Sequence, residues 1–213
     1  MPPDLSGTAF EIRMRDPLAE LLGSVPEGYV FSYRLEDMIL MTGHLCPTVT
    51  GAYLAAWAAI RKLYGDEPGR RGEVVIDIPG AVTDGSNGPI SQVFTFITGG
   101  AAENGFGGLG GRFRRRGLLR FHPDDLKPWT FYFSRTDTGA SVAVTADLGR
   151  VPPDPELGVH LQTALGEGTT DRTAFQRLWN ERIRKLVRQE WDKPGSIVRA
   201  ETAAPQHEGG VRS

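Results

Sequence analysis

The sequence has little cysteine, no long apolar run and no strong excess of either charge. Its 213 residues include one cysteine, Cys46, which excludes an internal disulfide and a zinc site built from several cysteines of one chain. No apolar run approaches the roughly 20 residues of a membrane-spanning helix. The net charge of −2 gives no global reason to expect nucleic acid or a membrane as partner. The N-terminus lacks the features of a signal peptide, so we expect a soluble cytoplasmic protein.

The apolar patterns predict one α+β domain with a mostly antiparallel sheet, packed by a central alanine-rich helix and by C-terminal helices. We expect a loose N-terminus at 1–15, the domain at 16–192 and a disordered tail at 193–213. The predicted helices are 17–22, 35–41 (a helix or a turn), a central helix that starts at Pro47, has its periodic apolar residues at 52–63 and stops at Gly65, and then 156–165 and 171–191. The predicted strands are 28–33, 73–78, 91–97, 118–121, 129–133 and 141–146.

The most informative motif is Gly43-His44-Leu45-Cys46-Pro47, directly before the alanine-rich helix. Proline is favoured at the first helical position, which makes Cys46 the expected N-cap. Free backbone N–H groups and the positive end of the helix dipole would then favour a thiolate, the form that acts as nucleophile or metal ligand. His44 would supply an imidazole in the same turn, either as a ligand or as a base.

These residues resemble the FmdE family, which is named after a component of formylmethanofuran dehydrogenase. The resemblance extends through Gly80-Ala81-Val82 and Thr98-Gly99-Gly100 to the helix motif Phe175-Gln176-Arg177-Leu178-Trp179-Asn180-Glu181-Arg182-Ile183, and so covers about 35–187. It implies an α+β core, an intertwined homodimer and a metal site that uses the histidine and cysteine of the first motif. It also implies a loose link to operons of molybdenum or tungsten enzymes, without defining an activity.

The chain departs from the FmdE pattern in its metal-ligand positions. Thr42 replaces a common second histidine, Gly80 and Gly100 replace later cysteines, and no zinc ribbon follows. The resemblance therefore leaves His44 and Cys46 as expected ligands of a divalent ion, with zinc as the expected metal. The shell would be completed by Asp84 as a weaker candidate, other polar groups, water, a partner chain or a substrate.

Three other features have simpler interpretations. Asp84 lies in a turn-rich loop, where aspartate commonly bonds its own turn. The arginines of 112–116 favour a solvated edge over an anion site. The glycine-rich segment 105–110 superficially resembles a dinucleotide fingerprint, but no convincing helix follows to bind a pyrophosphate.

Three functional hypotheses follow. The first is an open zinc site at His44 and Cys46 for a small molecule or anionic ligand, with the catalytic residues, if any, drawn from this pair. The second is a metal-free protein in which Cys46 is a reactive thiol and His44 its base. The third is a non-enzymatic, homodimeric accessory protein that associates through the alanine face of its central helix.

Overall fold

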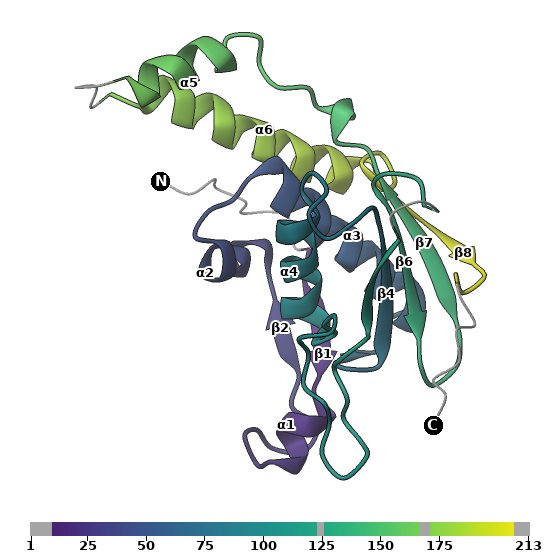
Figure 1. The fold of residues 1–213 in the computed structure, drawn as a ribbon. Helices are drawn as coiled ribbons and strands as arrows, with labels where there is room; N and C mark the ends of the chain where they lie inside the picture. Colours follow the sequence, from purple (N-terminus) through teal and green to yellow (C-terminus); the bar gives the residue numbers. More distant parts are fainter. Residues whose placement is uncertain (1–9, 123–125, 167–170, 207–213) are drawn as a thin grey trace.

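The computed structural model describes residues 10–122, 126–166 and 171–206 (Figure 1). The elements in chain order are β1 (Ile12–Arg15), α1 (Pro17–Leu21), β2 (Phe31–Tyr33), the 3-10 turn η1 (Leu35–Asp37), α2 (Met38–Thr42), α3 (Pro47–Tyr64), β3 (Gly69–Arg70), β4 (Val74–Pro79), α4 (Asn87–Thr98), β5 (Leu119–His122), β6 (Thr130–Arg135), β7 (Ser141–Ala146), η2 (Leu148–Arg150), α5 (Leu157–Leu165), α6 (Thr173–Asp192) and β8 (Val198–Ala203).

The main sheet has five strands in the order β5-β4-β6-β7-β8. Its pairings are antiparallel except that between β4 and β5, and Ile76 lies opposite both Phe133 of β6 and Leu119 of β5. A second, three-stranded sheet has the order β2-β1-β3. The predicted α+β class with a mostly antiparallel sheet is confirmed.

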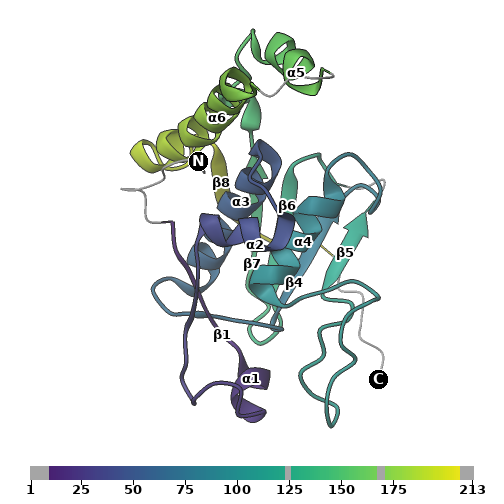
Figure 2. The same ribbon diagram turned by 90° about the vertical axis from the view of Figure 1, so that its left-hand side faces the viewer.

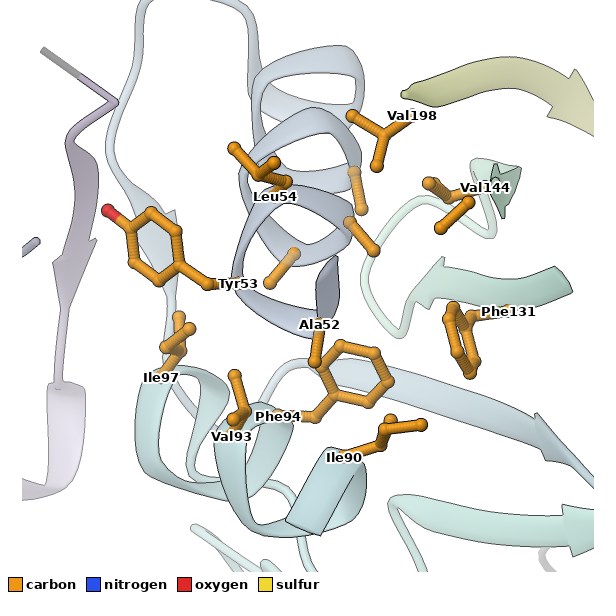
Figure 3. Packing of buried hydrophobic residues seen from close by; sticks show 14 of the residues in the cluster. Ala52, Tyr53, Leu54, Ile90, Val93, Phe94, Ile97, Phe131, Val144 and Val198 are labelled. Atoms are coloured by element: carbon orange, nitrogen blue, oxygen red, sulfur yellow. The ribbon is translucent and has the colours of Figure 1, made fainter. Parts of the chain in front are cut away.

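The alanine-rich helix α3 lies at the centre of the molecule, as predicted, and begins directly after Cys46. Its alanines are fully buried at Ala52, Ala55, Ala56 and Ala59. Small side chains let the neighbouring elements approach closely, and Figure 3 shows Phe94 of α4 packed beside Ala52, with Phe131 of β6 on the far side of the Phe94 ring. The Phe94 and Phe131 rings pack edge to face, with their centroids 5.1 Å apart. These contacts fix the position of α3, and therefore of its first turn, against the sheet.

The prediction of a strand at 91–97 is wrong, because these residues belong to helix α4. Val93, Phe94 and Phe96 alternate in part, which favoured a strand. The buried residues Ile90, Val93, Phe94 and Ile97 instead recur at helical spacing, and all four face the core. Gly88 and Pro89 lie in the first turn of α4, and because both residues are rare inside helices, the sequence did not indicate that a helix starts there. Proline at this position is compatible with a first helical turn, where backbone N–H groups have no partner within the helix.

Both expected loose ends contain a strand. Strand β1 lies within the segment 1–15, where Ile12 and Met14 point into the core. Strand β8 lies within 193–213 and pairs with β7. The buried Glu190 carboxylate accepts hydrogen bonds from the backbone of Gly195, Ile197 and Val198, and so fixes the turn into β8. Residues 1–9 and 207–213 lie outside the described part of the chain.

Arg112, Arg114 and Arg116 are exposed, as the solvated-edge interpretation expects, but Arg115 is an exception. Its side chain is only 9 % exposed, and Nη2 donates to Asp16 Oδ1 at 2.6 Å. Gly99 has φ = +72°, and a Cβ there would lie 2.2 Å from Arg115 Nη1. Glycine is required because both the backbone conformation and the space exclude a side chain. Arg115 therefore ties the glycine-rich segment to the N-terminal part of the fold.

Helices α5 and α6 form a hairpin that projects away from the body of the molecule in both views (Figures 1 and 2). The hairpin buries few large side chains on α5, where Val159 and Leu165 remain about 70 % exposed. The described helices include none with both the length and the apolar character to cross a membrane.

Candidate functional site

The His44–Cys46 segment connects α2 to α3. Gly43 ends α2 with φ = +75° and donates its N–H to the Ile39 carbonyl. This left-handed residue reverses the chain direction, which is the usual role of glycine at a helix C-terminus. Leu45 then inserts its side chain into the core and is 6 % exposed. His44, on one side of Leu45, is exposed, whereas Cys46, on the other side, is partly buried against the core at the start of α3.

Cys46 is the N-cap of α3, as predicted. Its backbone is extended (φ = −142°, ψ = 166°), Pro47 is the first helical residue, and Sγ accepts a hydrogen bond from the Val49 N–H at 3.4 Å. The thiol is partly buried and is not in a disulfide. The sulfur is thus held at the start of α3 by one backbone N–H.

His44 is exposed, and its ring has a defined orientation. Nδ1 lies 2.9 Å from the Thr42 carbonyl oxygen. Because a carbonyl only accepts, Nδ1 carries the hydrogen and Nε2 keeps a lone pair in the neutral ring. Imidazoles that bind a metal through Nε2 commonly donate from Nδ1 to a backbone carbonyl in this way. Thr42, which stands where the FmdE pattern has a second histidine, thus orients His44.

Trp179 of α6 contacts the same segment from the other end of the sequence. Its indole Nε1 donates to the Leu45 carbonyl at 2.9 Å. This bond joins residues 134 positions apart and holds the backbone between His44 and Cys46 against α6. Periodicity indicates only a core role for Trp179, so its contact with the motif is a finding of the structure.

Asp84 lies in the loop before α4 and has a structural role there. Its Oδ2 accepts from the Ala81 N–H at 2.7 Å, and the same loop is closed by Asn87 Nδ2, which donates to the Pro79 and Ala81 carbonyls. Within the described ranges, no three histidine, cysteine, aspartate or glutamate side chains are grouped as a metal site. The structure therefore does not bring Asp84 together with both His44 and Cys46.

A cleft of about 320 Å³ lies beside this loop and is lined by Asp84, Ile90, Trp129 and Phe131, among others. Trp129 also packs on α3, because a Cβ at Gly51 would lie 3.2 Å from the indole ring. In Figures 1 and 2 the start of α3 and the loop before α4 lie at the same end of the molecule. Trp129 thus connects the cleft to the helix that carries Cys46.

A second polar cluster, on β4 and β5, was not found from the sequence. The Asp77 carboxylate is completely buried, accepts from Arg120 Nη2 at 3.0 Å and lies 2.7 Å from His122 Nε2. Arg120 Nε lies 2.8 Å from Asp77 Oδ1 but lacks the alignment of a hydrogen bond. A buried carboxylate needs such partners. The only signal in the sequence is one acidic residue within an apolar strand, and its partners lie more than 40 positions away.

The comparisons with known proteins show likeness in the fold only. No family model and no curated protein matches the sequence. A solved structure from Syntrophus aciditrophicus, described as a tungsten formylmethanofuran dehydrogenase FmdE-like protein, is similar with a TM-score of 0.45 and 17 % sequence identity. The alignment covers 83 % of this chain and 74 % of that chain. At this identity the likeness concerns the fold alone.

Proposed function

We propose that this chain is a metal-binding protein of the FmdE type, in which His44 Nε2 and Cys46 Sγ are two donors to a zinc ion. The observation that carries the proposal is the geometry of the motif, with sulfur at the N-cap of α3 and an imidazole oriented by the Thr42 carbonyl. One thiolate and one imidazole are donors that a borderline divalent ion prefers. The residues present therefore fit part of a zinc shell.

The proposed site is open. Asp84 is already bonded in its own turn, so the remaining positions are left to water, a small anionic ligand or a partner chain. Catalytic zinc sites keep such an open position, and zinc bound there acts as a Lewis acid. In this proposal His44 and Cys46 bind the ion, Thr42 orients the imidazole, and Trp179 positions the backbone between the two ligands.

We also propose that the protein is a homodimer, but not through the alanine face of α3 as the sequence suggested, because the chain's own core covers that face. The α5–α6 hairpin projects from the body of the molecule, and the apolar side chains of Leu40, Val159 and Leu165 are exposed. Exposed apolar surface of this kind is stabilised when a second copy of the chain covers it. Sedimentation at micromolar concentration should give twice the mass of one chain. A monomer at that concentration would contradict the proposal.

The metal proposal is tested by elemental analysis of the full chain, purified without a histidine tag and dialysed against metal-free buffer. We expect zinc to be retained in a fixed ratio to protein. A protein that takes up no zinc from added zinc salt, but whose Cys46 is rapidly alkylated, would overturn the metal proposal and favour the reactive-thiol hypothesis.

Replacing Trp179 with phenylalanine should weaken zinc binding by about tenfold, a loss typical of an outer-shell partner. The aromatic packing is largely kept, but the hydrogen bond to the Leu45 carbonyl is lost, which should also lower the free energy of unfolding by about 1 kcal/mol. Competition titration with a chelating dye measures the affinity.

The control for this variant is Trp191→Phe on the same helix. The Trp191 indole is 42 % exposed and packs on Phe10, away from the Leu45 carbonyl. If Trp179→Phe loses stability but binds zinc as tightly as the unmodified chain, Trp179 is a packing residue and has no positioning role.

A further inference from the structure

A groove runs between α6 and the segment 150–155 that leads from η2 towards α5. Its volume is about 860 Å³, within the range of sites for small ligands. Figure 1 shows this segment passing along the side of α6. We call this feature the α6 groove. It is formed by different residues from those of the proposed zinc site.

The α6 groove has an apolar floor. Val151, Leu178 and Val187 are buried beneath it, at 6 %, 5 % and 2 % exposure. Its wall contains Pro152, Pro153 and Pro155, whose rings fix the backbone φ and remove backbone donors. A preformed wall of this kind loses little conformational entropy when a ligand binds.

The rim of the groove carries an excess of positive charge. Six basic residues line it, namely Arg150, Arg182, Arg184, Lys185, Arg188 and Lys193. Three acidic residues, Asp154, Glu181 and Asp192, also line it, which leaves a net charge of +3 (six minus three) on a chain whose net charge is −2. The lining of the groove is therefore positively charged, although the chain as a whole is slightly negative.

Four of these six basic residues form no ion pair within the described chain, whereas Arg150 pairs with Asp147 and Lys185 with Glu181. Glu181 already pairs with Lys185 at 2.9 Å and with Arg177 at 3.6 Å. Among the residues that the structure describes, Arg184, Arg188 and Lys193 form no ion pair. Arg184 and Arg188 are also four positions apart on one helix, where like charges repel. An anion in the groove would offset this repulsion.

Arg182 is partly buried and reaches the segment across the groove. Its Nε donates to the Val151 carbonyl at 2.9 Å, and it has no carboxylate partner in the described chain. Burial lowers the pKa of this guanidinium, and no acidic group opposes the shift. Its Nη2 also donates to the Leu148 carbonyl at 3.5 Å, so Arg182 joins the two sides of the groove, and without a carboxylate partner among the described residues it adds to the positive charge there.

We propose that the α6 groove binds a small organic oxyanion with an apolar body, its carboxylate or phosphate held by Arg184 and Arg188 and its apolar part lying on the floor of the groove. Guanidinium groups match both oxyanions in geometry. The apolar floor requires more than a bare inorganic ion.

The test is calorimetric titration of the full chain with decanoate, decyl phosphate, decanol and inorganic phosphate. We expect one molecule of decanoate or decyl phosphate to bind per chain, at least about ten times more tightly than either decanol or inorganic phosphate. The better of the two amphiphiles identifies the oxyanion. Equal binding of decanol, or no binding of either amphiphile, would overturn the proposal.

The double variant Arg184→Gln/Arg188→Gln should weaken binding of the preferred amphiphile at least tenfold. The matched control is Arg112→Gln/Arg114→Gln, which removes the same charge from exposed arginines of the glycine-rich segment. Cys46→Ser should bind the amphiphile unchanged, which separates this groove from the zinc site. Equal binding by the Arg184/Arg188 variant and its control would contradict the proposal, as would loss of binding in Cys46→Ser.

Discussion

Zinc binding should fall by more than about 100-fold when Cys46 is replaced by serine, because a directly bound donor contributes more than the 10- to 100-fold of an outer-shell partner. Serine keeps the cap of α3, since its hydroxyl accepts the Val49 N–H at least as well as sulfur does. The fold should therefore be retained, and only the soft donor is lost. His44→Ala should cause a comparable loss by removing the imidazole that Thr42 orients.

The matched control for these variants is His160→Ala. His160 lies on α5, where it faces Glu156 at 3.8 Å and is partly exposed like a typical surface histidine. Equilibrium dialysis with zinc, together with circular dichroism to verify the fold, compares the proteins. If Cys46→Ser and His44→Ala bind zinc as tightly as His160→Ala, the ion is held elsewhere and the proposed site is wrong.

Replacing Asp16 with alanine should lower the free energy of unfolding by about 3–5 kcal/mol, the usual cost of removing one partner of a buried ion pair. Asp16 pairs with Arg115 at 2.6 Å and with Arg71 at 2.9 Å, and it also caps α1 through the Leu18 N–H. Its loss leaves two cations without their shared carboxylate. Asp16→Asn should lose less, because asparagine keeps the cap but not the charge. Urea unfolding measures the difference.

The loss of unfolding free energy in Asp16→Ala should depend on pH. Partial burial alone would raise the pKa of Asp16, but the Arg115 and Arg71 guanidinium groups outweigh it and hold the pKa below its ordinary value of 3.8. A lowered folded-state pKa contributes stability that is fully present above pH 3.8 and is lost as the pH falls through the folded-state value. The stability gap between the unmodified chain and Asp16→Ala should therefore shrink below pH 3.8.

The control for Asp16 is an exposed pair at the β6–β7 turn. Asp137 contacts Arg135 at 2.6 Å, but its side chain is 40 % exposed. Asp137→Ala should cost about 1 kcal/mol or less, as solvent-exposed pairs do. Equal losses in Asp16→Ala and Asp137→Ala would show that burial of the Asp16 network does not contribute to stability.

Local patterns in the sequence predict most of the elements correctly. The start of α3 at Pro47, with Cys46 as its cap, follows from neighbouring residues alone, and so does the end of α3 at Gly65. Helix α4 shows the limit of such patterns, because Val93, Phe94 and Phe96 partly fit a period of two while Ile90, Val93, Phe94 and Ile97 fit a helix. The choice between a strand and a helix depends on which of these side chains are buried in the core, and one sequence does not show this.

Contacts between distant segments could not be predicted from one sequence. The Trp179 indole reaches Leu45, and Arg115 reaches Asp16, because the fold brings these segments together and not because of any local spacing. The buried Asp77 shows the same limit, since its partners Arg120 and His122 lie on another strand. Strand β8 depends on Glu190, whose carboxylate binds the turn before it.

X-ray absorption at the zinc edge tests the central claim most directly, because it reports which atoms surround the ion. For the zinc-loaded full chain we expect one sulfur at about 2.3 Å and an imidazole nitrogen at about 2.0–2.1 Å. The sulfur should disappear in Cys46→Ser and the imidazole signal should fall in His44→Ala. A shell of oxygen and nitrogen without sulfur in the unmodified chain would contradict the account.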